Sequence, residues 1–427
     1  MSLKPYIVKN RALFIFAVAI TGAVAGTAVW AFFFLMNLGL GLLWNALPRH
    51  FDFVAFPLVL CTIGGVVIGL VEKRNGPRPE PLGAVMQTVR ETGRYRYDDL
   101  GKSGLAAILP LIFGGSVGPE AGLTGIIAGL CTWVGDRLKR FGADFQELTR
   151  MGMSAALSAI FAAPLFGFVA PLCGDPERDN EITFPKKTKV VLYLVAIIGA
   201  LTPFIILQSL VGAAGGLPRF TGMELGVQEL IWFLPLLVLG SLAGWIYHAF
   251  DALAARIARL FGDRILLRSV VAGVVLGACG TLLPFTLFAG EHQLNELAGS
   301  WMGMGALVLG ATCFVKLFVT NLCIRCGWRG GNIFPVIFAG VALGYATAAV
   351  SGCDPVFCIV ISAACVCGGV MRNPLMASLL LILCFPITAL PLMFVAALVG
   401  GSIPLPARWT QPKTTAKPAE TDETGAL

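Results

Sequence analysis

Glycine and proline stand together at two places in this chain, each surrounded by apolar residues. Residues 114–122 read Gly-Gly-Ser-Val-Gly-Pro-Glu-Ala-Gly, and residues 330–335 read Gly-Gly-Asn-Ile-Phe-Pro. Glycine lets the backbone bend, and proline fits the first turn of a helix, where its missing N–H leaves no bond unmade. The first N–H groups of a helix lack partners and carry partial positive charge. Two such helix starts facing each other would therefore bind a small anion.

A second proline segment follows each of these stretches. Residues 162–165, Ala-Ala-Pro-Leu, come about 45 residues after Pro119, and residues 372–375, Arg-Asn-Pro-Leu, come about 39 residues after Pro335. The two copies are about 210 to 216 residues apart, which indicates an internal duplication. Gly/Pro-interrupted apolar segments at matching positions of two halves are typical of a transporter binding site between inverted repeats. The alternative is that each stretch only links two ordinary spanning helices.

The composition is that of a polytopic, all-α membrane protein. Of the 427 residues, 57% are hydrophobic and 13% are charged, and the mean hydropathy is +0.82. Basic residues near the start, Lys4, Lys9 and Arg11, place the N-terminus in the cytoplasm, and we expect the C-terminus there too. We expect a multi-pass protein of the cell inner (plasma) membrane. The basic residues stand in short loop clusters, and this argues against nucleic-acid binding.

The apolar pattern divides the chain into two membrane repeats with short ends. We expect a cytoplasmic lead over residues 1–11, a first repeat over 12–215, a second over 216–406, and a disordered tail over 407–427. The segment over residues 12–47 is too long for a signal-peptide core, so we expect it to be retained. Within the repeats the pattern predicts these further features: a helix over 90–102, a partial span over 105–113, a helix over 119–134, and helices over 335–350, 356–370 and 374–399.

Two other chemistries fit parts of the sequence less well. Residues 114–118 satisfy G-x-S-x-G, the nucleophile motif of hydrolases, but that motif needs a preceding strand and a histidine base, and the chain has only His50, His248 and His292. We therefore do not expect an enzyme. Four cysteines could bind a metal, but no histidine or carboxylate accompanies them, so we expect free thiols, no metal and no cofactor. These cysteines are Cys323, Cys326, Cys365 and Cys367.

In their order and spacing, these segments resemble the CLC family of chloride channels and proton/chloride antiporters. Residues 115–119 stand where that family has a GREGP-type motif, residues 331–335 where it has GxFxP, and residues 316–320 resemble the helix before the latter. The resemblance extends from residue 12 to about residue 406. It implies inverted-repeat halves with broken and tilted helices, a homodimer with one anion pathway per subunit, and a bacterial-type member without a C-terminal cytosolic domain.

The departures from the family pattern bear on mechanism. Val117 stands at the gate position, where the antiporters carry a glutamate, and their second carboxylate falls at about Cys173 or Gly174, one residue before Asp175. The pore serine and tyrosine of the family are also missing. We therefore expect backbone N–H groups of Val117, Gly118, Ile333 and Phe334, assisted by Ser116, to coordinate the anion. The predicted anion-binding residues are Ser116, Val117, Gly118, Pro119, Gly331, Asn332, Ile333, Phe334 and Pro335.

Three cations near the second stretch need a role. We expect Arg325 and Arg329 to raise the anion potential at a pore vestibule, with pairing to a carboxylate such as Glu120 as the alternative, and we expect Lys316 to be structural. The sequence as a whole predicts passive permeation of chloride or another small anion across a lipid bilayer. A proton-coupled antiporter of chloride or fluoride is the alternative, and a non-conducting membrane scaffold is less favoured.

Overall fold

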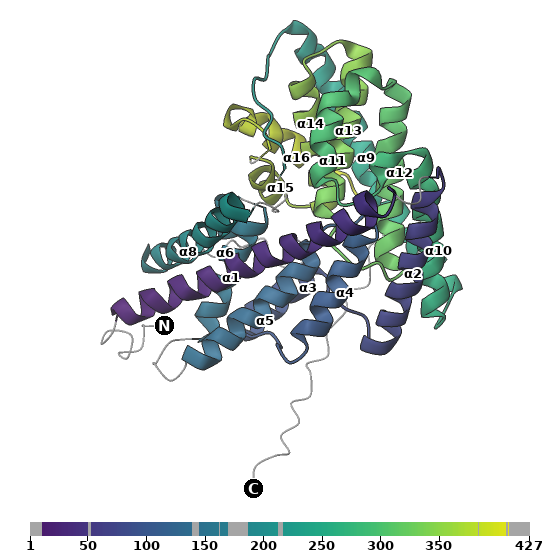
Figure 1. Ribbon diagram of the computed structural model, residues 1–427. Coiled ribbons are helices and arrows are strands. Elements are labelled where there is room, and N and C mark those ends of the chain that lie inside the picture. Colours follow the sequence, from purple (N-terminus) through teal and green to yellow (C-terminus); the bar gives the residue numbers. More distant parts are fainter. Residues whose placement is uncertain are drawn as a thin grey trace.

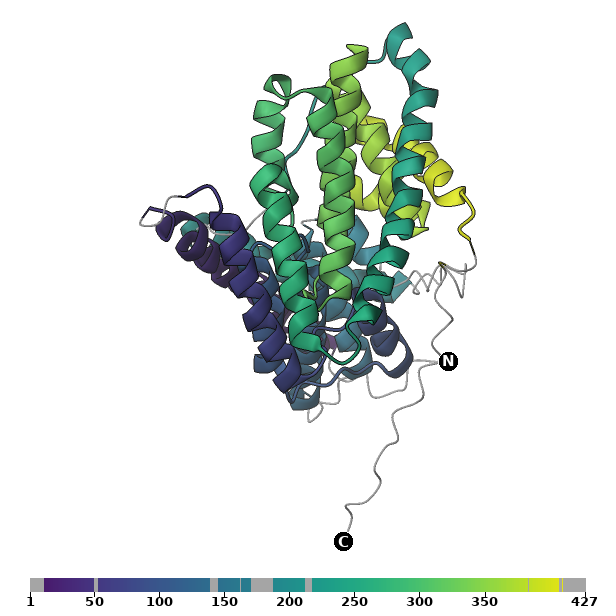
Figure 2. The ribbon, with the colours of Figure 1, turned by 90° about the vertical axis from the view of Figure 1, so that its right-hand side faces the viewer.

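The computed structural model describes residues 11–49, 53–138, 145–161, 163–169, 187–211, 217–382, 384–406 and 409. These residues form an assembly of α-helices (Figures 1 and 2). The helices are α1 (Arg11–Leu40), α2 (Phe56–Asn75), α3 (Leu82–Thr92), α4 (Leu100–Ile112), α5 (Glu120–Leu138), α6 (Phe145–Ile160), α7 (Pro164–Val169), α8 (Lys187–Val211), α9 (Val227–Leu260), α10 (Ile265–Leu282), α11 (Glu291–Ser300), α12 (Ala306–Arg325), α13 (Ile333–Ser351), α14 (Pro355–Met371), α15 (Pro374–Leu381) and α16 (Leu390–Ser402). A π-helical turn, Gly41–Ala46, extends α1.

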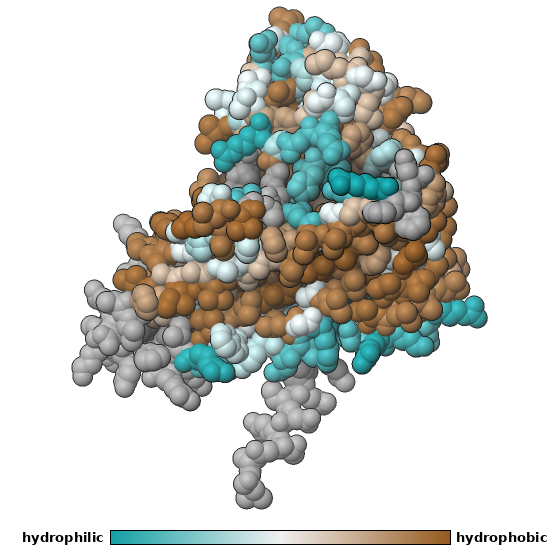
Figure 3. Space-filling view, viewed as in Figure 1, coloured by the Kyte–Doolittle hydropathy of each residue, from teal (hydrophilic) through white to brown (hydrophobic). Residues whose placement is uncertain are grey.

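Long apolar helices form a multi-span membrane protein, as the composition predicts. Among the described residues, seven helices are long and apolar enough to cross a bilayer: α1 with its π-helical extension, α2, α8, α9, α10, α12 and α13. In the most apolar window of α13, 89% of the residues are buried, against 28% for α8. Helix α13 is therefore the interior helix, whereas α8 faces outward. Figure 3 shows a broad hydrophobic band on the face that carries α1, with hydrophilic residues below it.

The same order of elements occurs twice along the chain. Helix α4 leads into an irregular segment, residues 113–119, which we call the first break, and α5, α6 and α7 follow. Helix α12 leads into residues 326–332, the second break, and α13, α14 and α15 follow. In Figure 1, α5 lies in the lower part of the molecule and α13 in the upper part. The two helices that follow the breaks thus run apart from a common middle.

Helix starts in the second half follow directly from local sequence. The Asp354 side chain accepts a hydrogen bond from the Phe357 N–H at 2.7 Å, and Asn373 accepts one from Met376 at 3.1 Å. Each of these caps is followed by proline at the first helical position. Proline there has the backbone angle of a helix and loses no bond. From these starts, α14 packs beside the interior helix α13, and α15 packs beside α14.

Two of the helices expected from the sequence are wrong in extent. The helix expected over residues 90–102 is instead α3, which ends at Gly93 in the left-handed conformation (φ 68°), and the chain is not helical again until Leu100. The helix expected over 374–399 is divided into α15 and α16, with Pro386 and a 3₁₀ turn at Ile387–Ala389 between them. Gly93 ends the first helix within a charged stretch, and Pro386 interrupts the second although the apolar residues continue. The expected lead and the expected disordered tail lie outside the described residues, except for Arg11 and Trp409.

Candidate anion-binding site

The two breaks meet through their backbones. Gly118 N–H donates to the Gly331 carbonyl at 2.7 Å, and Gly331 N–H donates to the Gly118 carbonyl at 2.7 Å. This antiparallel pair is the isolated bridge that the described residues contain. Irregular backbone inside a membrane needs such internal partners, because no water is available to satisfy it. The pairing brings the first residues of α5 and α13 close together. The hypothesis that two helix starts form one anion site requires this proximity.

A carboxylate from the first break occupies the start of α13. Glu120 is the first residue of α5, is fully buried, and accepts a hydrogen bond on Oε1 from the Ile333 N–H at 2.7 Å. The second oxygen, Oε2, has no hydrogen-bond partner among the described residues. An unpartnered charged oxygen in a buried place is costly, so this arrangement favours either a neutral acid or a displaceable one.

The two paired glycines provide the space for this carboxyl group. A Cβ atom added to Gly118 would collide with Oε2 of Glu120, and one added to Gly331 would collide with the carboxyl carbon. Neither glycine has a positive φ angle. The space beside the carboxyl group, more than backbone freedom, is therefore what requires glycine at both positions.

The predicted backbone donors are only partly available. The N–H of Gly118 is bound to the Gly331 carbonyl, and its predicted role in anion coordination stays a prediction. The N–H of Ile333 donates to the Glu120 carboxylate at the start of α13, and its role toward an anion stays a prediction. Val117 is buried in the core, where it packs against Gly330. Pro335 is buried in the first turn of α13, and Pro119 is the last residue before α5.

Polar side chains behind the breaks bind one another. Ser116 Oγ lies 3.0 Å from Thr320 Oγ1 of α12, and both residues are fully buried. Asn332 Nδ2 donates to the Tyr247 hydroxyl at 2.6 Å, which joins the second break to α9. The side chains of Ser116 and Asn332 are thus hydrogen-bonded to the neighbouring helices α12 and α9, and their predicted roles in anion binding stay predictions.

The three cations have specific partners. Arg325 binds Asp251 of α9 through two hydrogen bonds of 2.6 Å. Arg329 binds Glu72 of α2 at 3.1 Å, and the same carboxylate accepts from Arg268 of α10 at 3.1 and 3.2 Å. Two guanidinium groups against one carboxylate leave this cluster with one net positive charge. Arg325 and Arg329 are thus ion-paired, but with Asp251 and Glu72 and not with Glu120.

Lys316 is a fully buried residue of α12 that binds carbonyl groups. Its Nζ donates to the carbonyls of Phe285, Leu287 and Phe288 at 3.0, 2.9 and 2.9 Å, and lies 4.7 Å from the centre of the Phe338 ring. The segment that it binds in turn donates to the first break, because Phe288 N–H binds the Gly114 carbonyl at 3.0 Å. The position of Lys316 is that of a structural residue.

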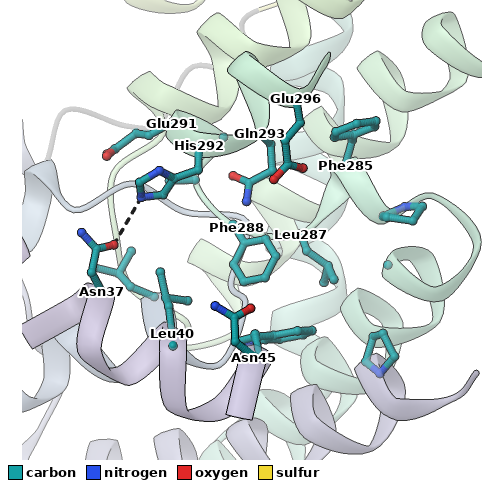
Figure 4. A pocket seen from close by; sticks show the side chains of 18 of the residues that line it. Asn37, Leu40, Asn45, Phe285, Leu287, Phe288, Glu291, His292, Gln293 and Glu296 are labelled. Carbon is teal, nitrogen blue, oxygen red and sulfur yellow. Dashed lines mark hydrogen bonds between the residues drawn. The ribbon is translucent and has the colours of Figure 1, made fainter. Parts of the chain in front are cut away.

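A cavity of about 820 Å³ opens beside the first break. It lies between the end of α1, the end of α10 and the start of α11, and Leu111 of α4 is part of its wall. His292 on one side forms a hydrogen bond of 3.2 Å with Asn37 on the other, and Glu291, Gln293 and Glu296 line the same wall as His292 (Figure 4). Phe288 of the cavity wall donates to the Gly114 carbonyl, so the cavity borders a segment that is bound to the first break.

Several sequence predictions cannot be placed. Residues 170–186 lie outside the described residues, so the expected second relay position at Cys173 or Gly174, with Asp175 beside it, stays a prediction. His50 is also outside them. The structure describes one chain, and the homodimer stays a prediction. Within the described part of the chain, no group of three or more His, Cys, Asp or Glu side chains could hold a metal ion.

Comparison with known proteins identifies the family. The sequence profile described as "Voltage gated chloride channel" matches residues 64–403. The chain belongs to this family, the CLC family. It is 26% identical over 319 residues to YfeO of Escherichia fergusonii, covering 71% of each chain, and 27% identical over 318 residues to YfeO of Salmonella choleraesuis, covering 71% of this chain and 72% of the relative. YfeO is provisionally assigned to ion transport in both organisms.

Solved structures with the same CLC fold include two antiporters. A CLC-type fluoride/proton antiporter superposes with a TM-score of 0.72 at 18% identity, over 94% of this chain and 97% of the other. A slow cyanobacterial Cl⁻/H⁺ antiporter gives a TM-score of 0.72 at 17% identity, over 94% and 95%. The fold class and the family predicted from the motifs are confirmed. CLC proteins carry out anion transport and are not enzymes, which also excludes the hydrolase alternative.

Sequence reasoning missed Glu120 as a residue of the site. Comparison with the family motif directs attention to position 117, where this chain has valine, and Glu120 stands three residues later. A usable signal was present, because Glu120 is the acidic residue in the first turn of the helix that follows the first break. What the sequence could not show is that the side chain contacts the start of α13 and not that of its own helix.

Proposed function

We propose that this CLC protein transports a small anion through the site at the start of α13, and that the Glu120 carboxylate must leave this site before an anion can bind. The observation that carries the proposal is the hydrogen bond of 2.7 Å from Ile333 N–H to Glu120 Oε1. A backbone donor at a buried helix start is the group that an anion needs, and a carboxylate of the protein already uses it. Glu120 therefore competes with the transported anion.

Protonation decides this competition. An ionised Glu120 repels a second negative charge and holds the donor, whereas a neutral carboxyl group does neither as strongly. Lower pH favours the neutral form, so anion flux should rise as the pH falls. Flux should rise with acidity whether the neutral Glu120 side chain leaves the start of α13 or stays beside it.

The presence of an ionisable group in the site favours proton-coupled exchange over passive permeation. Passive permeation was favoured because Val117 cannot carry a proton. Glu120 supplies a proton-binding group three residues later, in contact with the start of α13. We therefore propose proton-coupled exchange of chloride or fluoride as the function, with passive permeation as the competing outcome. Chloride-loaded liposomes in low-chloride medium separate the two, because only an exchanger moves protons against their gradient.

The test replaces the carboxyl group by its amide. Flux of chloride, fluoride and nitrate is measured in liposomes containing the wild type or Glu120→Gln at about pH 4.5 and about pH 7.5, on both sides of the usual carboxyl range. We expect wild-type flux to rise with acidity. Glu120→Gln should be about tenfold faster than the wild type at the higher pH and should be insensitive to pH, because the amide never becomes a competing charge. Uphill proton movement should disappear in this variant.

A carboxylate away from the site provides the control. Glu91 on α3 is exposed and binds Gln87 at 2.7 Å, so Glu91→Gln should behave as the wild type. If Glu120→Gln keeps the pH dependence of the wild type, the carboxylate is not the group that opens the site and the proposal is wrong. If wild-type flux depends on pH but no protons move against their gradient, transport is passive. In that case Glu120 controls access to the site but does not couple anion and proton movement.

A further inference from the structure

A short segment between α10 and α11 separates the cavity from the anion site. Its residue Phe288 binds the first break through the Gly114 carbonyl, and its carbonyls bind Lys316. Its last residue, Gly290, has φ 109°, and a Cβ there would press on Phe338 of α13. Phe338 is about one and a half helical turns beyond Ile333, whose N–H donates to Glu120. The segment therefore fixes the start of α11 close to the anion site.

Glu291, the first residue of α11, is a buried acid with no role in the proposed function so far. It is 3% exposed, and neither of its carboxyl oxygens has a hydrogen-bond partner among the described residues. A negative charge on Glu291 is disfavoured first by burial and then by the charge of Glu120. Figure 4 shows its carboxyl group directed away from His292 and Glu296, which belong to the same helix. A buried, unpartnered acid next to a second one is costly unless protons can reach it.

The surroundings of Glu291 connect it to water on one side. It is part of the cavity wall, and its neighbours His292 and Glu296 are exposed. The other titratable or charged groups around it are Glu120 from α5 and Lys316 from α12, whose Nζ is bound to the carbonyls of the preceding segment. Glu291 is thus a buried acid that lines the open cavity and is influenced by the charge of Glu120.

We propose that Glu291 is a proton-transfer residue between the cavity and Glu120. A proton from cavity water binds the Glu291 carboxylate and then passes to the unpartnered Oε2 of Glu120, so that Glu291 becomes ionised as Glu120 becomes neutral. No electrons are exchanged and no co-reactant is needed. The neutral Glu120 releases the start of α13 to the anion. This role rests on the proposed function, because it has meaning only if protonation of Glu120 opens the site.

The experiment combines substitutions at both acids. Chloride efflux from liposomes is measured at about pH 4.5 for the wild type, Glu291→Gln, Glu120→Gln and the double variant. Glu291→Gln should slow acid-stimulated flux about fivefold or more, since a proton-transfer group commonly contributes at least that much to a rate. In the Glu120→Gln background, where no proton is needed, the same substitution should change flux by less than about twofold. Glu291→Asp, which keeps an acid, should recover most of the wild-type flux.

Each result bears on one of the two proposals. If Glu120→Gln removes the pH dependence and Glu291→Gln equals the wild type, the relay is wrong and the proposed function stands. Equal slowing in both backgrounds overturns the relay as well, because the residue then acts on the anion path or on folding. If Glu120→Gln has no effect, both proposals fail. Glu291→Met supplies the same comparison should the amide variant not fold. Glu91→Gln, an exposed acid of α3 that does not line the cavity, is the control that should leave flux unchanged.

Discussion

The first and second breaks have paired backbones but carry different side chains. At the first break the following helix begins with an acid, Glu120, and at the second it begins with the apolar residues Ile333 and Phe334. The acid of one helix binds the N–H of the other. One half therefore supplies the charge and the other supplies the donor. The related glycine-proline stretches give both helices the same kind of start. The residues immediately after them differ, so that α5 contributes a carboxylate and α13 contributes a backbone donor.

The two breaks are also anchored in a similar way by different partners. Trp44 Nε1 donates to the Ile112 carbonyl just before the first break at 2.9 Å, and Trp328 Nε1 within the second break donates to the Ser269 carbonyl at 3.0 Å. The first break is also attached through Phe288, whose N–H donates to the Gly114 carbonyl. This attachment comes from a segment held by Lys316 of the second half. The first break thus depends on the second half of the chain for its position.

The largest effect should follow from filling the space between the two breaks. In Gly331→Ala, the added methyl group collides with the carboxyl group of Glu120 and presses on the paired backbone. We expect chloride flux in liposomes to fall by about tenfold or more at every pH, because the donor and the carboxylate are displaced together. Gly118→Ala should act in the same direction through Oε2.

A glycine of α11 serves as the control for this prediction. Gly299 has no neighbouring atom within 4 Å of an added Cβ, so Gly299→Ala should transport as the wild type does. If Gly331→Ala is folded and fully active with unchanged pH dependence, the carboxylate does not need the space between the breaks. The two breaks would then be a structural pair only.

Removing the lysine that joins the halves should mainly lower stability. Lys316→Met leaves three buried carbonyls of residues 285, 287 and 288 without their donor. We expect the free energy of unfolding in detergent to fall by about 3 kcal/mol, at roughly 1 kcal/mol for each unmade bond. Lys102 is an exposed residue that pairs with Asp99 at 2.8 Å, so Lys102→Met should cost less than about 0.5 kcal/mol. Equal losses in the two variants would argue against a structural role for Lys316.

The sequence could predict the parts of the site that depend on local pattern. Paired glycines and nearby prolines indicated both helix starts, and the spacing indicated that they belong to corresponding halves. The pairing of Gly118 with Gly331 was not predictable in this way, since it joins residues 213 positions apart through backbone atoms alone. That pairing is why the N–H of Gly118 is occupied. It is also why the side chain of Glu120 contacts the other helix.

The cation partners show the same limit. Arg325, Arg329 and Lys316 stand close together in sequence and invited one explanation, but Asp251, Glu72 and the carbonyls of residues 285–288 come from three separate elements. Whether a buried cation is ion-paired depends on partners that are distant in the sequence. The hydrophobic periodicity of the sequence does not indicate these partners. The chain positions of the cations were predictable, but their electrostatic effect was not.

The smallest effect should come from the side chain of Ser116, and it sharpens the comparison between backbone and side-chain contributions. Ser116 Oγ lies 3.0 Å from Thr320 Oγ1, so the hydroxyl joins the first break to α12. Ser116→Ala removes one buried hydrogen bond and should cost about 1 kcal/mol of stability, while chloride affinity measured by calorimetry changes less than about twofold. Because Thr320→Val removes the other partner with little change of shape, the double variant should cost less than the sum of the two single variants. A loss of affinity of about tenfold in Ser116→Ala, with Thr320→Val unaffected, would instead make the serine hydroxyl a direct anion ligand. The backbone start of α13 would then share its role with the first break.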